Sequence, residues 1–225
     1  ISLRLVHRDP PKQPGMESST LVVIKEFDLA PLVRSFGKDA RLLRVSGAGP
    51  GGKASGISFL LDVSIPSKKL FHLIGIKDLE SMEAVFRLTD REPLSRWPRR
   101  AFGDLDGDGR VDLVFSTKNS FQMLFQDPGG RWSGPRRLPS ARGGESGSWV
   151  RSLSVADLDG DGRTEVVVSR GEFNDYSVEV HQVNRNRDPV LKDVKVLGRT
   201  SVSLLPDRKG FLVVTANHKL REDWK

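Results

Sequence analysis

Short runs of β-branched and aliphatic residues alternate with turn-forming residues along most of this chain. Runs of this length and composition predict β-strands rather than helices. The predicted strands cover residues 2–7, 20–27, 41–46, 57–65, 99–104, 111–117, 120–126, 131–138, 165–169, 201–205 and 211–215. Residues 77–84 are the exception, because they are also compatible with a short helix. No apolar stretch approaches the roughly 20 residues of a membrane-spanning helix. The pattern therefore indicates an all-β protein.

Two nearly identical acidic segments, about 53 residues apart, interrupt this pattern. Residues 104–112 read DLDGDGRVD, and residues 157–165 read DLDGDGRTE. Carboxylates at alternating positions repel one another unless a hard cation lies among them, and the glycines let a short backbone curl until the oxygens converge. The predicted metal ligands are Asp104, Asp106, Asp108, Asp112 and the carbonyl of Arg110 in the first loop, and Asp157, Asp159, Asp161, Glu165 and the carbonyl of Arg163 in the second.

Two alternatives to this interpretation have specific requirements. An EF-hand would close its loop with Glu at position twelve between two helices, whereas position twelve here is Phe115 or Val168, inside an apolar β-branched run. A metal-free acidic β-turn would need a single Asp-Gly pair rather than the whole alternating set. The sequence therefore predicts metal loops that connect strands, and calcium is the expected ion, with one ion in each loop.

The segment Phe102-Gly103 followed by DLDGDGRVD and a Val-rich strand resembles the FG-GAP and VCBS repeats. In the second copy Val155-Ala156 stands in place of Phe-Gly, and the metal positions are intact. The resemblance covers residues 97–170 directly. It implies a calcium-binding β-propeller like the heads of integrin alpha subunits, built from four-stranded antiparallel blades. It also implies that the calcium loops mainly stabilise the blades, whereas ligands dock on other loops.

The repeat period extends this architecture over the whole chain. Stepping one period back and one forward from the acidic loops reaches further strand pairs, which lack the aspartates. We therefore expect a single propeller domain over residues 1–225, with units at about 41–96, 97–148, 149–197 and 198–225, the last completed by N-terminal strands within 1–28. About four blades would form a small closed ring; the alternative is part of a larger propeller.

Composition and charge bear on location and partners. The chain has no cysteine, so calcium would take the stapling role of disulfides, and it does so best outside the cytosol. We therefore expect a secreted, periplasmic or cell-surface protein, beginning either after a removed signal or inside a longer chain. The net charge of +7 favours an acidic glycan or acidic protein partner, and no nucleic-acid motif is present. The basic residues cluster at Arg96, Arg99, Arg100, Arg136, Arg137, Arg185 and Arg187.

These observations predict a non-catalytic binding, adhesion or assembly module rather than an enzyme. It would bind a protein or glycan, either alone or as a subunit of a larger extracellular assembly. The alternative is a polysaccharide lyase or hydrolase on a propeller scaffold. That function would need acid and base residues beyond the metal loops. The candidates for it are Glu145, Glu172, Asp175 and Glu179.

Overall fold

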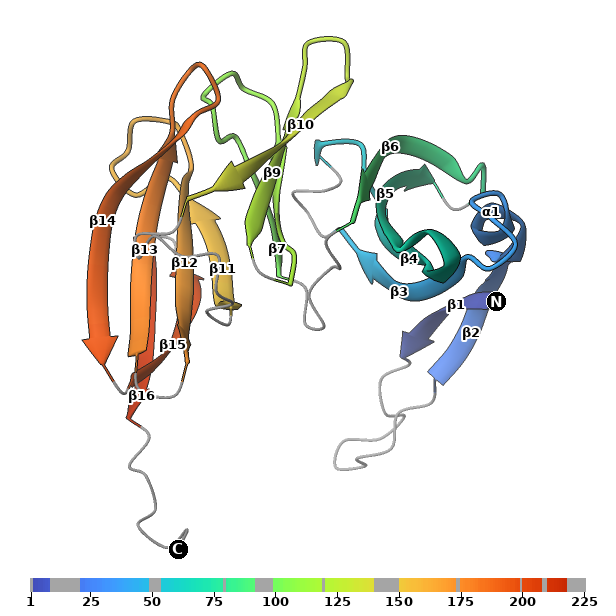
Figure 1. The fold of residues 1–225 in the computed structure, drawn as a ribbon, viewed down its shortest axis with the longest axis horizontal. Coiled ribbons are helices and arrows are strands. Elements are labelled where there is room, and N and C mark those ends of the chain that lie inside the picture. Colours follow the sequence, from blue (N-terminus) through green and yellow to red (C-terminus); the bar gives the residue numbers. More distant parts are fainter. Residues whose placement is uncertain are drawn as a thin grey trace, which may run out of the picture. The chain divides into compact units, whose positions relative to one another are not determined.

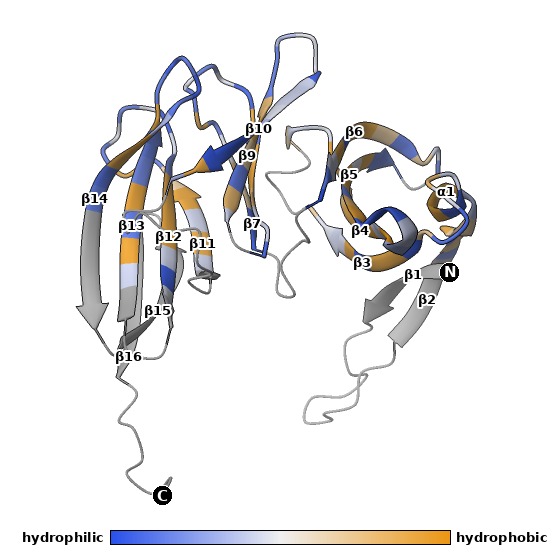
Figure 2. Cartoon of the chain, viewed as in Figure 1, coloured by the Kyte–Doolittle hydropathy of each residue, from blue (hydrophilic) through white to orange (hydrophobic). Residues whose placement is uncertain are grey.

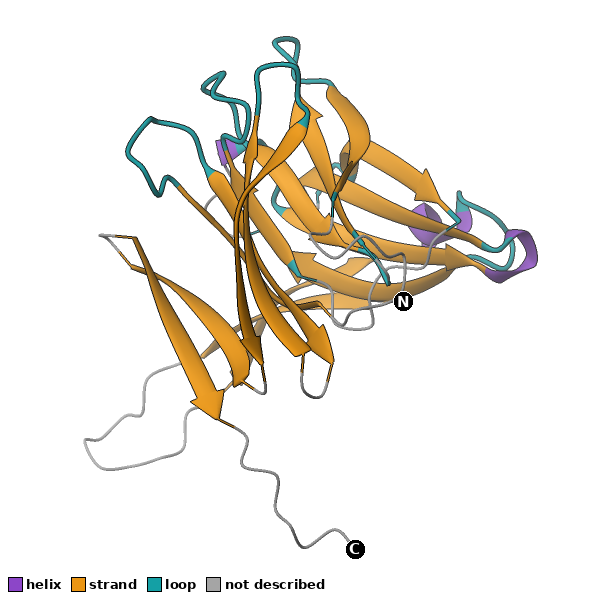
Figure 3. Ribbon diagram, turned by 60° about the vertical axis from the view of Figure 1, so that its left-hand side comes forward, coloured by secondary structure: helices purple, strands orange, loops and turns teal. Residues whose placement is uncertain are grey.

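The computed structural model gives an all-β protein, as the strand pattern predicts. It describes residues 2–8, 21–48, 54–78, 80–91, 99–118, 120–139, 150–172, 175–198, 200–207 and 210–217. Within them lie sixteen strands, one five-residue α-helix and one three-residue 3-10 helix, and Figure 3 shows how far the strands predominate. None of the helices in this part of the chain has the length and apolarity needed to cross a bilayer.

The strands form three four-stranded antiparallel sheets and two hairpins. The four-stranded sheets are blade-like, because each takes its strands in sequence order from one edge to the other (Figure 1). The chain divides into two compact units, residues 1–47 with 58–91 and residues 48–57 with 92–225. The expectation of one propeller domain over 1–225 stays a prediction, as does closure of its last blade by N-terminal strands.

The first unit contains one four-stranded sheet and one hairpin. The hairpin pairs β1 (Ser2–Arg8) with β2 (Leu21–Asp28). The sheet has the order β3-β4-β5-β6. Its strands are β3 (Arg41–Gly47), β4 (Phe59–Ile65), β5 (Leu70–Asp78) and β6 (Glu83–Asp90). Residues 80–82 form the turn between β5 and β6, so the short helix considered for residues 77–84 does not form.

One face of this sheet is covered by a segment that the strand pattern did not predict. Helix α1 (Ala30–Arg34) follows β2, and Leu29 and Val33 are fully buried there. They pack with Phe27 against apolar residues of β4 and β5. Leu61 and Val63, the residues of β4 in this cluster, are fully buried. The hairpin, the helix and the sheet thus share one hydrophobic core.

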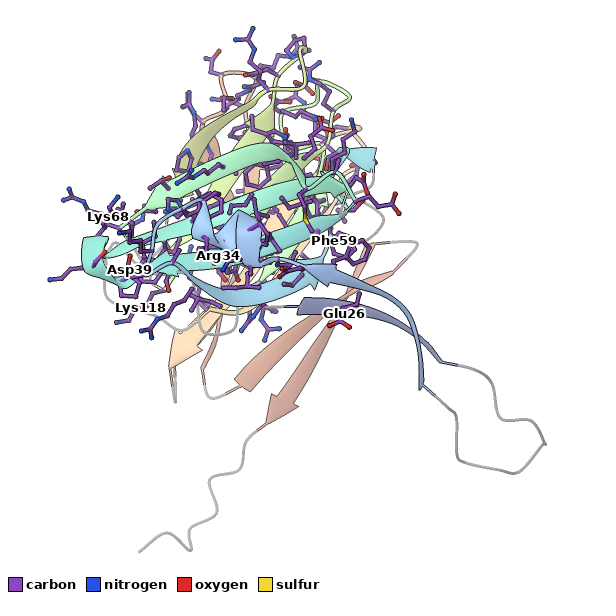
Figure 4. The ribbon with its side chains drawn as sticks, turned by 90° about the vertical axis from the view of Figure 1, so that its right-hand side faces the viewer. Glu26, Arg34, Asp39, Phe59, Lys68 and Lys118 are labelled. Atoms are coloured by element: carbon purple, nitrogen blue, oxygen red, sulfur yellow. The ribbon has the colours of Figure 1, made fainter. Side chains whose placement is uncertain are left out.

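A second contact fixes the loop after α1 to the far end of β4. The 3-10 helix Pro66–Lys68 connects β4 to β5, and the Ser67 amide donates to the Asp39 carboxylate over 2.6 Å. Hydrogen bonds from Ser67 lower the pKa of Asp39, and the Lys68 charge adds to the effect. Figure 4 shows Asp39 and Lys68 at the same end of the sheet.

The second unit contains two four-stranded sheets and a hairpin. The first sheet consists of β7 (Arg100–Gly103), β8 (Asp112–Ser116), β9 (Phe121–Gln126) and β10 (Trp132–Leu138). The second consists of β11 (Val150–Ala156), β12 (Glu165–Glu172), β13 (Asp175–Val183) and β14 (Pro189–Gly198). The hairpin pairs β15 (Thr200–Asp207) with β16 (Gly210–Asn217). Each strand predicted between residues 99 and 138 is confirmed to within one residue.

The two four-stranded sheets of this unit share a hydrophobic core. Apolar side chains of β8 and β9, among them Phe121, Met123 and Phe125, form one cluster with Val166 and Val168 of β12. All five are buried almost completely. Figure 2 shows the apolar residues along the strands and mostly hydrophilic residues in the loops that join them. The packing brings the two acidic loops, one from each sheet, next to one another.

Candidate metal centres

The first acidic loop connects β7 to β8 and is organised around the carboxylate of Asp104. Its oxygens accept backbone hydrogen bonds from Gly107 at 2.9 Å, Asp108 at 3.0 Å and Gly109 at 2.8 Å. Gly107 and Gly109 have φ values of 75° and 82°, which disfavour residues with a side chain. The alternation of aspartate and glycine therefore produces the tight curl that the sequence predicted.

Three of the predicted ligands of the first loop come together. One carboxylate oxygen each from Asp104, Asp106 and Asp108 lies within 4.8 Å of the others. The Oδ1 atom of Asp106 is buried and has no hydrogen-bond partner among the described residues. Burying an unpaired carboxylate oxygen costs free energy unless a cation binds to it. Burial raises the pKa of Asp106, and the charge of Asp108 adds to the effect. An oxygen-only donor set with an orphaned buried oxygen fits a hard divalent cation.

The other two predicted ligands of this loop are differently engaged. Both oxygens of Asp112 accept backbone hydrogen bonds, from Leu105 at 3.0 Å and Gln126 at 2.9 Å. Burial raises the pKa of Asp112 to about 7. The Arg110 side chain pairs with Asp108 and donates to the Gln126 carbonyl at 2.9 Å. In this geometry Asp112 braces the loop against β9 and is not part of the oxygen group, so its role as a ligand stays a prediction, as does that of the Arg110 carbonyl.

The second acidic loop connects β11 to β12 and repeats this plan with one change. Asp157 accepts the amides of Gly160 at 2.7 Å and Gly162 at 3.0 Å. The close oxygen group here consists of Asp157, Asp159 and Glu165. Burial raises the pKa of Glu165, and the charges of Asp159 and Asp161 add to it. The predicted ninth-position carboxylate therefore joins the group in this loop, whereas it does not in the first.

The remaining predicted ligands of the second loop lie beside the group. Asp161 accepts the Arg163 amide at 2.9 Å. The side-chain amide of Gln182, on β13, donates to both Asp161 and Glu165, at 3.3 Å each. Gln182 therefore orients two carboxylates of this loop. The carboxylate of Asp161 and the carbonyl of Arg163 stay predicted ligands.

The two loops contact each other directly. The Thr164 amide donates to the Asp104 carbonyl at 2.9 Å, and the Thr164 hydroxyl donates to the same oxygen. Gly103 lies against the same threonine, so that a Cβ at this position would be 2.8 Å from Thr164 Oγ1 and 3.1 Å from Val155. A Cβ on Gly107 would likewise meet the Arg163 side chain at 2.8 Å. Gly103 and Gly107 therefore permit the close approach of the second loop.

Comparison with known families reaches the same region. Residues 104–168 match the FG-GAP-like repeat. The match spans both acidic loops and confirms the resemblance that their residues carry. Among curated proteins, no sequence matches the chain significantly.

Arg187 contacts the first acidic loop, and sequence reasoning missed this contact. It lies in the turn between β13 and β14 with a positive φ of 65°. Its guanidinium donates to Asp106 at 2.8 Å, to Asp127 at 2.5 Å and to the Ser133 hydroxyl at 2.7 Å. The sequence placed Arg187 in a surface basic cluster. Its contact with Asp106 spans 81 residues, so no local signal could have revealed it.

The acidic residues considered for catalysis lie outside the FG-GAP-like loops. Glu179 is fully buried, 3.1 Å from Arg170 and 3.1 Å from His181. Glu172 and Asp175 are backbone partners where β12 meets β13. Glu145 lies outside the described residues. The charge of Glu179 is balanced by Arg170 inside the core. Such an environment is that of a structural ion pair.

Proposed function

We propose that this chain is a non-catalytic binding module whose blades are stabilised by calcium. The proposal rests on two groups of carboxylate oxygens, one in each acidic loop, and on the hydrogen bonds that join the two loops. Three carboxylates within 4.8 Å repel strongly when all are ionised. A bound calcium ion would neutralise that repulsion and cross-link each loop. Since each loop joins two strands of one sheet and touches the next, the effect would extend to the contact between the sheets.

The residues proposed to hold the ions differ slightly between the loops. The first would use Asp104, Asp106 and Asp108. The second would use Asp157, Asp159 and Glu165. Calcium is favoured because every side-chain donor is a carboxylate oxygen and because such loops tolerate irregular coordination. Extracytoplasmic location follows as part of the proposal, since calcium is abundant enough there to fill sites of modest affinity.

The proposed partner is an acidic protein or glycan. The chain carries a net charge of +7, and β10, an outer strand of its sheet, exposes Arg136 and Arg137. Arg131, just before β10, is exposed as well. Clustered exposed guanidinium groups attract polyanions and bind carboxylate or sulfate groups in a bidentate manner. Arg136 is ion-paired with Asp188, so the proposal rests on Arg131 and Arg137.

The competing function, a propeller-based polysaccharide lyase or hydrolase, has weaker support. Of its four candidate residues, Glu179 is buried and ion-paired with Arg170, which counts against a role in proton transfer to a sugar. Turnover of acidic polysaccharides by the purified protein would favour the enzyme. Binding without turnover would favour the module.

The binding proposal is tested with immobilised acidic glycans and polyanionic peptides at two salt concentrations. We expect binding that weakens steeply with salt, because contacts between exposed charges are screened. Arg131→Gln with Arg137→Gln should reduce it further. Lys118→Gln with Lys192→Gln is the matched control, since both lysines are exposed and this pair also loses two positive charges. Binding that is independent of salt, or equal in the double variant and the control, would contradict the proposal.

A further inference from the structure

Arg187 is held beside the first loop by contacts with residues outside that loop. Its guanidinium contacts Asp127 and Ser133, both outside the loop, and lies over the Phe125 ring with 5.2 Å to the centroid. Its side chain is only 21% exposed. These contacts hold the guanidinium in place independently of the loop carboxylates. Its positive charge therefore remains beside the loop whether or not a metal ion is bound.

The contact of Arg187 with the loop satisfies only part of Asp106. The guanidinium donates to Oδ2 of Asp106 at 2.8 Å and lies 3.7 Å from Asp108. The other oxygen of Asp106, Oδ1, is buried without a hydrogen-bond partner among the described residues. Arg187 thus neutralises part of the loop charge while leaving an oxygen for a second cation.

The second loop has a different neighbour. Gln182 reaches it from β13 and donates to Asp161 and Glu165 at 3.3 Å. An amide orients carboxylates as a guanidinium does, but it brings no net charge. Repulsion between a resident arginine and an incoming divalent ion weakens binding, and the effect is large where both are partly shielded from water. The two loops therefore differ in electrostatics despite their nearly identical sequences.

We propose that Arg187 makes the two calcium loops unequal. It acts as a built-in cation that keeps the first loop folded without calcium and lowers the affinity of that loop, so the second loop fills first. The inference rests on the proposed binding of calcium by both loops. Arg187 is a positioning and charge-setting residue, since it acts on the ion through Asp106 and Asp108.

The test is calorimetric titration of calcium into the full chain and its variants. Asp159→Ala removes the second site and leaves the first to be measured alone. In that background Arg187→Gln should tighten calcium binding on the order of tenfold, whereas Arg187→Lys, which keeps the charge, should change it little. Arg185→Gln is the matched control, because Arg185 is exposed in the same turn and loses the same charge.

A second measurement needs no change at Arg187. The unaltered protein should show two classes of site that differ in calcium affinity. Asp106→Ala should remove the weaker site, and Asp159→Ala should remove the tighter site. Two equal sites, loss of the tighter site in Asp106→Ala, or an unchanged affinity in Arg187→Gln would overturn the inference alone. Absence of any calcium binding by the unaltered protein would instead overturn the proposed function, and this inference with it.

Discussion

Gly103 should not tolerate even the smallest side chain. It ends β7 at the place where the second acidic loop packs on the first sheet. A Cβ there would lie 2.8 Å from Thr164 Oγ1, 3.2 Å from Thr164 Cβ and 3.1 Å from Val155 Cγ2. The threonine cannot simply rotate away, because its hydroxyl donates to the Asp104 carbonyl. Gly103→Ala therefore has to separate the two sheets slightly or break that hydrogen bond.

The expected cost follows from overpacking at a close contact. Extra methyl groups in packed interiors destabilise by about 1–3 kcal/mol, and a broken hydrogen bond would keep the value in the same range. The assay is urea unfolding followed by tryptophan fluorescence. Gly129→Ala is the matched control, because a Cβ there meets nothing within 4 Å. A free energy of unfolding for Gly103→Ala equal to that of the control would refute the reasoning.

Three further predictions concern charge and packing. Burial raises the pKa of Asp112 from 3.8 to about 7. Between these pH values the folded metal-free protein keeps a proton that the unfolded chain releases. The free energy of unfolding, measured in EGTA, should therefore fall by up to about 4 kcal/mol as the pH rises from 3.8 to 7. Glu179→Gln leaves the buried charge of Arg170 without its partner, and urea unfolding should show a loss of about 3–5 kcal/mol. Gly75→Ala puts a Cβ 2.4 Å from the Phe86 ring, so near-ultraviolet circular dichroism and urea unfolding should report a displaced ring and a loss of about 1–3 kcal/mol.

Each of these three predictions has an outcome that contradicts it. An unfolding free energy that rises with pH from 4 to 7 in EGTA would reverse the sign expected from Asp112. Glu83→Gln is the control for Glu179, because it removes an exposed partner of Lys77 and should cost less than about 1 kcal/mol; equal losses would contradict the distinction. An unchanged spectrum for Gly75→Ala would show that Phe86 does not lie over the glycine.

The strands were predictable because their signal is local. In residues 99–138 the alternation of β-branched runs with turn residues gives each boundary to within one residue, since a turn such as Asp127–Gly130 closes with its own backbone hydrogen bond at 2.8 Å. The same locality gave the acidic loops, where Asp104 bonds to amides three to five positions away. The repeat period and the resemblance of the loops to FG-GAP repeats predicted about four units with four-stranded antiparallel blades, and three four-stranded antiparallel sheets are present in the described residues.

Helix α1 was not predictable in this way. Five residues are too few to show helical periodicity, and the amide of Ala30 is bonded by Asp28 at 2.9 Å in an ordinary turn-like contact. The segment becomes helical where Leu29 and Val33 pack on the sheet. That burial depends on tertiary structure, which overrides weak local preference.

The candidate site shows the same limit. The sequence named ten candidate ligands but could not tell which of them lie close together. In the structure Asp112 accepts backbone hydrogen bonds, whereas Glu165 at the equivalent position joins the close group of carboxylates. One extra methylene in the glutamate gives it a longer reach from an equivalent position. Arg187 and Gln182 were missed because their partners lie 81 and up to 21 residues away, where no spacing rule applies.

The central claim is that both acidic loops bind calcium and thereby stabilise the fold. Scanning calorimetry of the protein in millimolar calcium and in EGTA tests it most directly. We expect a higher melting temperature in calcium, corresponding to about 2.7 kcal/mol for each site at a free concentration of one hundred times its Kd. The combined variant Asp106→Ala with Asp159→Ala should lose most of that difference. Equal melting temperatures of the unaltered protein in calcium and in EGTA would contradict the claim.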